Sequence, residues 1–389
     1  MSIRKEALES KAFQALKDVY DNREKVLLEQ KEKGTIIVGE LGCDVPDELI
    51  LAAGMFPVHI YADPQKPLLE TDRYLEYAFD PVVRAQFEKI VDGTYGELID
   101  YLAVSNSTDV IIRIYLYLRE MHRQGMGKNL PPVEFIDWMF TRNRMHQVRN
   151  EDTIKIFWEA VETWAGRKIT EEEVKKAAEI CNADREALRE MAKLRRAEEV
   201  RINGSEALVI IGSAFFMDRE EHTRLVKEVT EDAKSWPVID GPRVYFTGSG
   251  QEDTGFYDMV EDSGCVIVGE DHDWGDRYYE RDYNTVYAPV RAIVDRYMLR
   301  EFSSKKAFVS QRVEALNREV EEAGAQAVIF ATNIYEEAAS WDYPSQRNSL
   351  EEKGIKTISF AQLQYPLGKN EGLKDKVSAF ADSLKGGNH

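Results

Sequence analysis

Residues 34–63, GTIIVGELGCDVPDELILAAGMFPVHIYAD, decide the fold of this chain. Their pattern predicts a buried strand over Thr35–Val38, a loop, a helix that opens at Pro46, and a second strand over Phe56–Tyr61. Proline suits the first helical turn, where its missing N–H costs no hydrogen bond, and Gly54 suits the helix exit. A strand, a helix and a strand in so short a span form one βαβ unit. Such units build parallel sheets whose ligand sites lie at the carboxyl ends of the strands.

The rest of the chain extends this pattern into four parts. We expect one amphipathic N-terminal helix over residues 1–33, a first α/β domain over 34–149, a helical layer over 150–234 and a second α/β domain over 235–389. Strands and helices alternate in both α/β parts, which predicts doubly wound parallel sheets of the Rossmann or flavodoxin type. Thr170-x-x-Glu173 is a capping box that starts a helix in the layer. The two halves are expected to face each other across a cleft between their loop ends.

Composition restricts the class of protein. The 389 residues carry a net charge of -19, which argues against binding to nucleic acid or to an anionic membrane surface. Mean hydropathy is -0.46, and no apolar run approaches the length of a membrane span. The first residues lack the apolar core of a signal peptide. We therefore expect a cytoplasmic protein.

The three cysteines, Cys43, Cys181 and Cys265, show no C-x-x-C spacing. A sparse and odd set argues against a disulfide framework and favours a reducing compartment. Cys181 stands in a helical pattern and Cys265 begins an apolar strand, so both are expected to be small buried hydrophobes. Cys43 follows the first strand, where it could reach a ligand or serve only in packing.

The run VPDELILAAGMFPV, residues 45–58, resembles the segment V-P-E-E-L-I-x-A-A-G-M-x-P-V of the 2-hydroxyacyl-CoA dehydratase and benzoyl-CoA reductase family. The similarity extends from Gly34 to Phe360. The resemblance implies two homologous subunits, an acyl-CoA bound in the cleft between domains, and an ATP-dependent activator that supplies one electron. It also implies a [4Fe–4S] cluster held by three cysteines in each subunit.

The positions where the family places those cysteines hold oxygen side chains here. Asp80 stands at the first, Thr108 beside Asp109 at the second, and Tyr335 beside Glu336 at the third. Hard oxygen ligands do not replace the soft thiolates that such a cluster needs. We therefore expect no conventional cluster ligands in this chain and a cluster only in a homologous partner subunit. A homodimer and a bound flavin remain open alternatives.

The candidate catalytic residues are expected to meet at the carboxyl end of the sheets, where paired carboxylates support acid–base chemistry or hold a hard cation. His272 lies between Asp271 and Asp273, in the densest ionisable cluster of the chain; the alternative is an incidental, exposed loop histidine. The candidate catalytic set is Asp80, Thr108, Asp109, His272, Tyr335 and Glu336. The candidate substrate-binding set is Cys43, Pro46, Glu48, Ser107, Gly248 and Arg277.

Three further features leave alternatives open. Arg277 is expected either to anchor an acidic group of the substrate or to pair with Asp276 or Glu280. The loop TGSGQEDTG, residues 247–255, lacks the third glycine of a dinucleotide fingerprint, so it predicts a tight turn that lets backbone approach a ligand. Aromatic residues in 277–290 form the floor of an acyl pocket or, more simply, pack between domains. The remaining histidines show no metal-binding spacing; they are His59, His122, His146, His222 and His389.

These observations favour a subunit of an enzyme that acts on an acyl-CoA thioester, as the cluster-less partner of an iron–sulfur subunit. Two alternatives stand beside it. One is a non-catalytic scaffold or binding homologue. The other is a lyase or hydrolase that holds a metal through His272 and the carboxylates.

Overall fold

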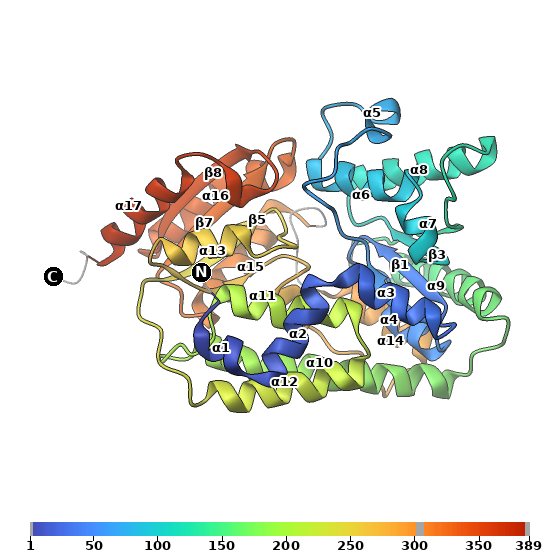
Figure 1. Ribbon diagram of the computed structural model, residues 1–389, viewed down its shortest axis with the longest axis horizontal. Coiled ribbons are helices and arrows are strands. Elements are labelled where there is room, and N and C mark those ends of the chain that lie inside the picture. The colour runs from blue at the N-terminus through green and yellow to red at the C-terminus, as the bar shows by residue number, and fades with distance from the viewer. Residues whose placement is uncertain (1–2, 301–306, 386–389) are drawn as a thin grey trace.

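Two four-stranded, all-parallel sheets form the framework of the molecule. The computed structural model describes residues 3–300 and 307–385, so His389 lies outside it. The strand orders are β2-β1-β3-β4 and β6-β5-β7-β8. Figure 1 shows the first sheet at the right, the second at the upper left, and the green to yellow helices α10, α11 and α12 beneath them. The predicted fold class of two doubly wound α/β domains is confirmed.

The first sheet follows the predicted pattern closely. Its strands are β1 (Ile37–Leu41), β2 (Phe56–His59), β3 (Tyr101–Ser105) and β4 (Val133–Ile136). Its connecting helices are α4 (Asp47–Ala52), α5 (Thr71–Tyr74), α6 (Pro81–Val91), α7 (Thr94–Leu98) and α8 (Asp109–Gln124). Strand β1 begins at Ile37, two residues later than expected. The N–H of Thr35 donates to the carbonyl of Gln30, so Thr35 still forms part of the C-terminal end of the preceding helix.

The second sheet repeats this arrangement. Its strands are β5 (Arg243–Gly248), β6 (Val266–Glu270), β7 (Ala327–Asn333) and β8 (Lys356–Leu363). Its helices are α13 (Gly255–Asp262), α14 (Pro289–Met298), α15 (Val309–Glu322), α16 (Glu337–Glu352) and α17 (Leu373–Lys385). Helix α14 is an exception, because its Ile293 and Tyr297 join the hydrophobic core around Leu49 and Ile50 of the first domain.

The N-terminal segment is three helices rather than the one expected: α1 (Lys5–Glu9), α2 (Lys11–Asp21) and α3 (Arg23–Glu32). Ser10 is extended and its Oγ accepts a hydrogen bond from the N–H of Phe13, so it caps α2. The side chain of Asn22 donates to the carbonyl of Asp18 and ends α2. Both residues use side-chain bonds that compete with a continuous helix.

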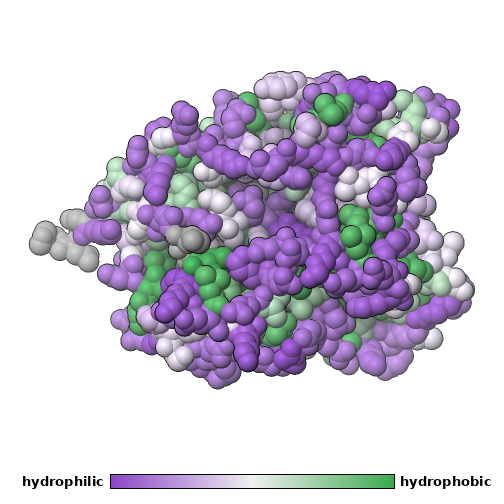
Figure 2. Space-filling view, in the orientation of Figure 1, coloured by the Kyte–Doolittle hydropathy of each residue, from purple (hydrophilic) through white to green (hydrophobic). Residues whose placement is uncertain are grey.

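The helical layer consists of α9 (Arg144–Ala165), α10 (Glu171–Arg196), α11 (Gly204–Ser213) and α12 (Arg219–Ala233). The predicted capping box of Thr170 and Glu173 is present at the start of α10. Within the described residues, the apolar length needed to cross a membrane is not reached by any helix. Figure 2 shows a mostly hydrophilic face, as the net charge of -19 suggests.

Helix α10 connects the two sheets through two fully buried arginines. Arg185 Nη2 lies 2.6 Å from Glu48 Oε1 on α4, beside the first sheet. Arg195 Nη1 lies 2.9 Å from Glu270 Oε1 at the end of β6, in the second sheet. The two arginines are ten residues apart, so a rigid helix separates them by about 15 Å. This spacing fixes where the ends of the two sheets stand relative to each other.

The pair of Arg185 and Glu48 gives a test of this framework. In Glu48→Gln, Arg185 and the neighbouring Arg296 remain buried without their counter-charge, because Arg296 Nε lies 3.4 Å from the same carboxylate. We expect the free energy of unfolding to fall by roughly 3–5 kcal/mol in urea titrations. The matched control is Glu186→Gln on the exposed side of α10, expected to change it by less than about 1 kcal/mol. Equal losses in both variants would contradict a special role for Glu48.

Candidate functional site

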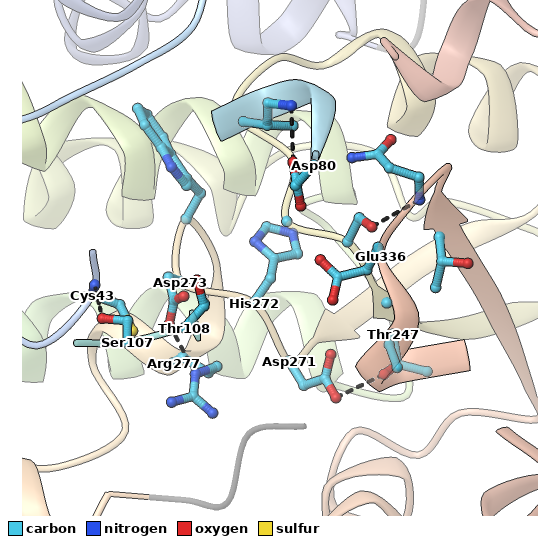
Figure 3. Close-up of a pocket in the computed structure, with 18 of the residues that line it drawn as sticks. Cys43, Asp80, Ser107, Thr108, Thr247, Asp271, His272, Asp273, Arg277 and Glu336 are labelled. Carbon is cyan, nitrogen blue, oxygen red and sulfur yellow. Dashed lines mark hydrogen bonds and ion pairs between the residues drawn. The ribbon is translucent and has the colours of Figure 1, made fainter. Parts of the chain in front are cut away.

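A cavity of about 240 Å³ lies where the carboxyl ends of both sheets meet. The lining includes Cys43 after β1, Ser107 after β3, Gly248 at the end of β5 with Ser249 next to it, and Asn333 at the end of β7. In each sheet the chain leaves the two central strands in opposite directions, which creates the crevice where ligands bind in open α/β folds. Figure 3 shows the side chains of both domains converging there.

A serine hydroxyl ties the two central loops together in each sheet. Ser107 Oγ accepts from the N–H of Cys43 at 2.9 Å, and Ser249 Oγ accepts from the N–H of Asn333 at 2.9 Å. Gly248 has φ +136, and a Cβ there would lie 2.1 Å from the carbonyl oxygen of Ala331. Gly248 is therefore required by the close approach of the neighbouring strand β7, and the chain bends at Ser249 and again over residues 252–254.

His272 lies inside the site rather than on an exposed loop. His272 is only 4 % exposed, and Figure 3 shows its imidazole in the middle of the lining residues. Nε2 is 2.7 Å from the hydroxyl of Tyr257, whereas Nδ1 has no hydrogen-bond partner among the described residues. Burial lowers the pKa of His272 to about 4, so the ring is neutral at pH 7.

The two aspartates beside His272 have opposite environments. Asp271 accepts from Thr247 Oγ1 at 2.7 Å, and burial raises its pKa to about 6. Burial also opposes ionisation of Asp273, but Arg277 outweighs it and the pKa of Asp273 falls to about 2. Arg277 Nε lies 3.0 Å from Asp273 Oδ1. One acidic group is thus near its titration point at neutral pH, and the other is permanently ionised.

The two expected acidic partners of Arg277 also pair with other arginines. Asp276 pairs with Arg195 and Arg196, and Glu280 pairs with Arg300 at 2.8 Å, although the charge of Glu280 also raises the pKa of Arg277. The chain after β6 also brings Asp273, four residues earlier, against the guanidinium of Arg277.

Besides His272, three members of the expected catalytic set line the cavity: Asp80, Thr108 and Glu336. Each stands at the N-cap of a helix. Asp80 accepts from the N–H groups of Val82 and Val83, and Thr108 accepts from the N–H of Ile111 at 3.1 Å. Glu336 makes no such capping bond at the start of α16. Helix capping therefore accounts for part of what Asp80 and Thr108 do.

Four other candidates lie away from the cavity lining. Asp109 has a side chain that is 80 % exposed and faces Arg113. Tyr335 packs its ring edge-on against Tyr77. Pro46 precedes α4 at its N-cap, and Glu48 is enclosed with Arg185 as described above. The cavity thus receives Cys43, Ser107, Gly248 and Arg277 from the candidate substrate-binding set.

The sequence analysis missed four ionisable residues that line the cavity: the buried Glu40 and Glu252 and the half-buried His59 and Glu319. Burial raises the pKa of Glu252 to about 7 and that of Glu319 to about 8. The signal for Glu40 is visible in the sequence, since a glutamate interrupts the apolar run of β1. His59, at the end of β2, stacks on Phe215 at 3.8 Å between ring centres, which no local pattern reveals.

The residues around the cavity do not fit a [4Fe–4S] cluster. Cys43 is the single thiol among the described lining residues. Cys181 and Cys265 are buried elsewhere, which confirms their expected role as small hydrophobes. In residues 3–300 and 307–385, no three histidine, cysteine or acidic side chains are arranged to hold a metal ion. A cluster needs three or four thiolates, so one thiol among oxygen groups is an unsuitable donor set.

Comparison with known proteins agrees with this architecture. The profile of the family described as 2-hydroxyglutaryl-CoA dehydratase, D-component, matches residues 43–384. The chain is 24% identical to the (R)-phenyllactyl-CoA dehydratase beta subunit of Clostridium sporogenes, over 96% of this chain and 99% of the relative. It is 24% identical to the lactoyl-CoA dehydratase subunit beta of Anaerotignum propionicum, over 95% and 97% of the two chains. It is 22% identical to a subunit of benzoyl-CoA reductase from Thauera aromatica, over 88% and 89%. The family expected from residues 45–58 is confirmed, and the chain belongs to the 2-hydroxyglutaryl-CoA dehydratase D-component family.

Proposed function

We propose that this chain is the cluster-less subunit of a 2-hydroxyacyl-CoA dehydratase-like enzyme, and that it binds the acyl end of a CoA thioester in the cavity. A homologous iron–sulfur subunit supplies the redox chemistry, and an ATP-dependent activator serves that subunit. The observation that carries the proposal is a cavity with both polar and apolar lining residues and one thiol, at the crevice of both sheets. Two of its relatives are named as beta subunits, which supports a partner.

The size of the cavity determines which part of the substrate it takes. Pockets for drug-sized ligands span about 300–1,000 Å³. A cavity of about 240 Å³ holds a small acyl group and its thioester, while the nucleotide part of CoA stays outside. Polar groups on the wall, such as Thr108, Thr247 and Glu336, then orient the acyl oxygens.

His272 is the proposed proton acceptor. Burial and the nearby Glu270 carboxylate, which Arg195 holds, keep the pKa of the Tyr257 hydroxyl well above its ordinary value, so this group stays protonated. In the tautomer that carries Nε2–H, the tyrosine oxygen accepts from Nε2 at 2.7 Å, and Nδ1, which has no hydrogen-bond partner among the described residues, carries the lone pair. A base with its other nitrogen held in this way is positioned for proton transfer.

A non-catalytic binding subunit is the second candidate function. It is favoured by the capping bonds of Asp80 and Thr108, which give both residues a structural task independent of any reaction.

Metal analysis tests whether the iron–sulfur cluster is held by the partner subunit and not by this chain. We expect anaerobically purified protein to hold no stoichiometric iron or acid-labile sulfide, because a single cavity thiol cannot retain a cluster. The complex with its iron–sulfur homologue is expected to hold them. The control is Cys43→Ser, which should leave the iron content of the complex unchanged. Stoichiometric iron and sulfide in the isolated chain would contradict the proposal.

Substitution of His272 tests its role in the assembled enzyme. His272→Gln is expected to lower kcat by about 10²–10⁴-fold, the usual contribution of a general base, with little change in thioester affinity. Because the pKa of His272 is about 4, the wild-type base is protonated and lost only as the pH falls toward 4. His146→Gln on the exposed start of α9 is the matched control, with unchanged kcat. A kcat within twofold of wild type in the His272 variant would exclude the assignment.

A further inference from the structure

The cavity extends beyond the strand ends into a space between the second sheet and two of its helices. Thr247, Phe330 and Ser359 are cross-strand neighbours on β5, β7 and β8, and all three line the cavity. Neighbours in register point to the same face of a sheet, so this face is the floor of the space. Helices α15 and α16 pack on the same face, in one hydrophobic cluster with Phe330 (Figure 1). We call this space the side chamber.

Each of the two helices turns one side toward the side chamber. The residues that line it are Arg312, Ala315, Leu316 and Glu319 on α15, and Ala339, Asp342, Tyr343 and Gln346 on α16. Both sets follow the spacing i, i+3, i+4, i+7, which places their members on a single side of a helix. Sheet register and helical spacing therefore agree that a sheet face and two helix faces enclose the side chamber.

The side chamber offers apolar contacts to a ligand. The rings of Phe330 and Tyr343 meet edge to face, with 4.8 Å between their centres. Leu316, Ala339 and Ala361 add aliphatic groups to the lining. An apolar group that enters this space loses contact with water and gains contact with rings and methyl groups, which is favourable.

The hydroxyl groups around the side chamber already have partners within the protein. The Tyr245 hydroxyl donates to Glu319 Oε2 at 2.5 Å, and the hydroxyls of Thr332 and Ser340 lie 3.1 Å apart. These groups do not depend on a ligand for their hydrogen bonds, so they do not demand a polar occupant.

The positive charges of the lining are also compensated. Among the described residues, the arginines and lysines that line the cavity are Arg277 and Arg312. Arg312, on the wall of the side chamber, places Nε 2.5 Å from Asp342 Oδ2, and both residues are buried. Arg277 pairs with Asp273, as described above. A ligand carboxylate in the side chamber would therefore have to compete with Asp342 for its counter-charge.

Two carboxyl groups of the lining show that negative charge is disfavoured in this part of the cavity. Asp271 accepts from Thr247 on the floor, and Glu319 stands on the wall. Burial raises the pKa of Asp271 to about 6 and that of Glu319 to about 8. A carboxylate of the ligand placed beside them would meet the same cost of losing water.

We propose that the side chamber receives the side chain of the acyl group and selects an uncharged, apolar side chain over one that ends in a carboxylate. This assignment rests on the proposed function, because it places a 2-hydroxyacyl thioester in the cavity. Ala339 and Ala361 determine the width of the side chamber, because their small side chains leave the space that an aromatic or branched group needs.

Calorimetry of the full chain with two thioesters tests the assignment. Ala339→Leu is expected to weaken the binding of phenyllactyl-CoA by about tenfold or more, because the added side chain occupies the space of the ring. Lactoyl-CoA, whose side chain is a methyl group, is expected to bind the variant as it binds wild type. Ala361→Leu, at an exposed position of β8, is expected to act in the same direction and provides the test if Ala339→Leu does not fold. Circular dichroism verifies the folding of each variant.

The matched control is Ala338→Leu, one residue earlier on α16 and equally half-buried but not part of the cavity lining. It is expected to bind both thioesters as wild type does. Unchanged phenyllactyl-CoA affinity in both Ala339→Leu and Ala361→Leu would overturn the assignment of the side chamber. An equal loss for lactoyl-CoA would overturn it as well, because the small side chain does not need this space.

Two ligands of the same shape test the selection against charge. 2-Hydroxyglutaryl-CoA carries a terminal carboxylate, and 2-hydroxy-5-methylhexanoyl-CoA carries an isopropyl group in its place. Wild type is expected to bind the charged thioester about tenfold or more weakly, because the side chamber offers its carboxylate no uncompensated cation. Equal or tighter binding of the charged thioester would contradict the selection. Absence of binding of all four thioesters would count against the proposed function itself, and the assignment would fall with it.

Discussion

The structure depends on the guanidinium groups that α10 places in its interior. Arg185 neutralises Glu48 beside the first sheet, and Arg195 neutralises Glu270 in the second. In each pair, the close contact between opposite charges offsets the free-energy cost of removing both groups from water. Because both arginines stand on one rigid helix, the distance between the two sheets follows from helix geometry. The distance between the two walls of the cavity at the strand ends is therefore also set by α10.

The same carboxylate-rich start of α4 serves both the framework and the cavity. Asp47 pairs with Arg219 of α12, and the next residue, Glu48, pairs with Arg185 of α10. The first helix of the opening βαβ unit is therefore attached to the helical layer by two charges. Glu40, at the end of the neighbouring strand β1, is among the residues that line the cavity. The position of this wall thus depends on the ion pairs that lie behind it.

Local pattern was sufficient for the alternation of strands and helices in the two α/β domains and for the capping box at Thr170, but not for the breaks between the three N-terminal helices. It also predicted the burial of Cys181 and Cys265, because apolar periodicity reports which face of an element is covered. It could not predict that Glu48 would be buried in an ion pair with Arg185, a residue 137 positions later in the chain. His59 and Glu40 were missed for the same reason, since their partners Phe215, Asp47 and Arg219 come from other elements. His272 was found from its acidic neighbours, but its burial follows from packing against Phe246 and Tyr257.

The capping bonds of Asp80 and Thr108 have a consequence for the ligands that these two positions can offer. The family resemblance places thiolates at these two positions, and here each side chain instead satisfies backbone N–H groups at the start of a helix. A good N-cap contributes about 0.5–2 kcal/mol, and a thiol is a poor substitute. Cysteine at either position is therefore expected to lower the stability of the helix that begins there, so a soft ligand at these two sites would come at the expense of a helix cap.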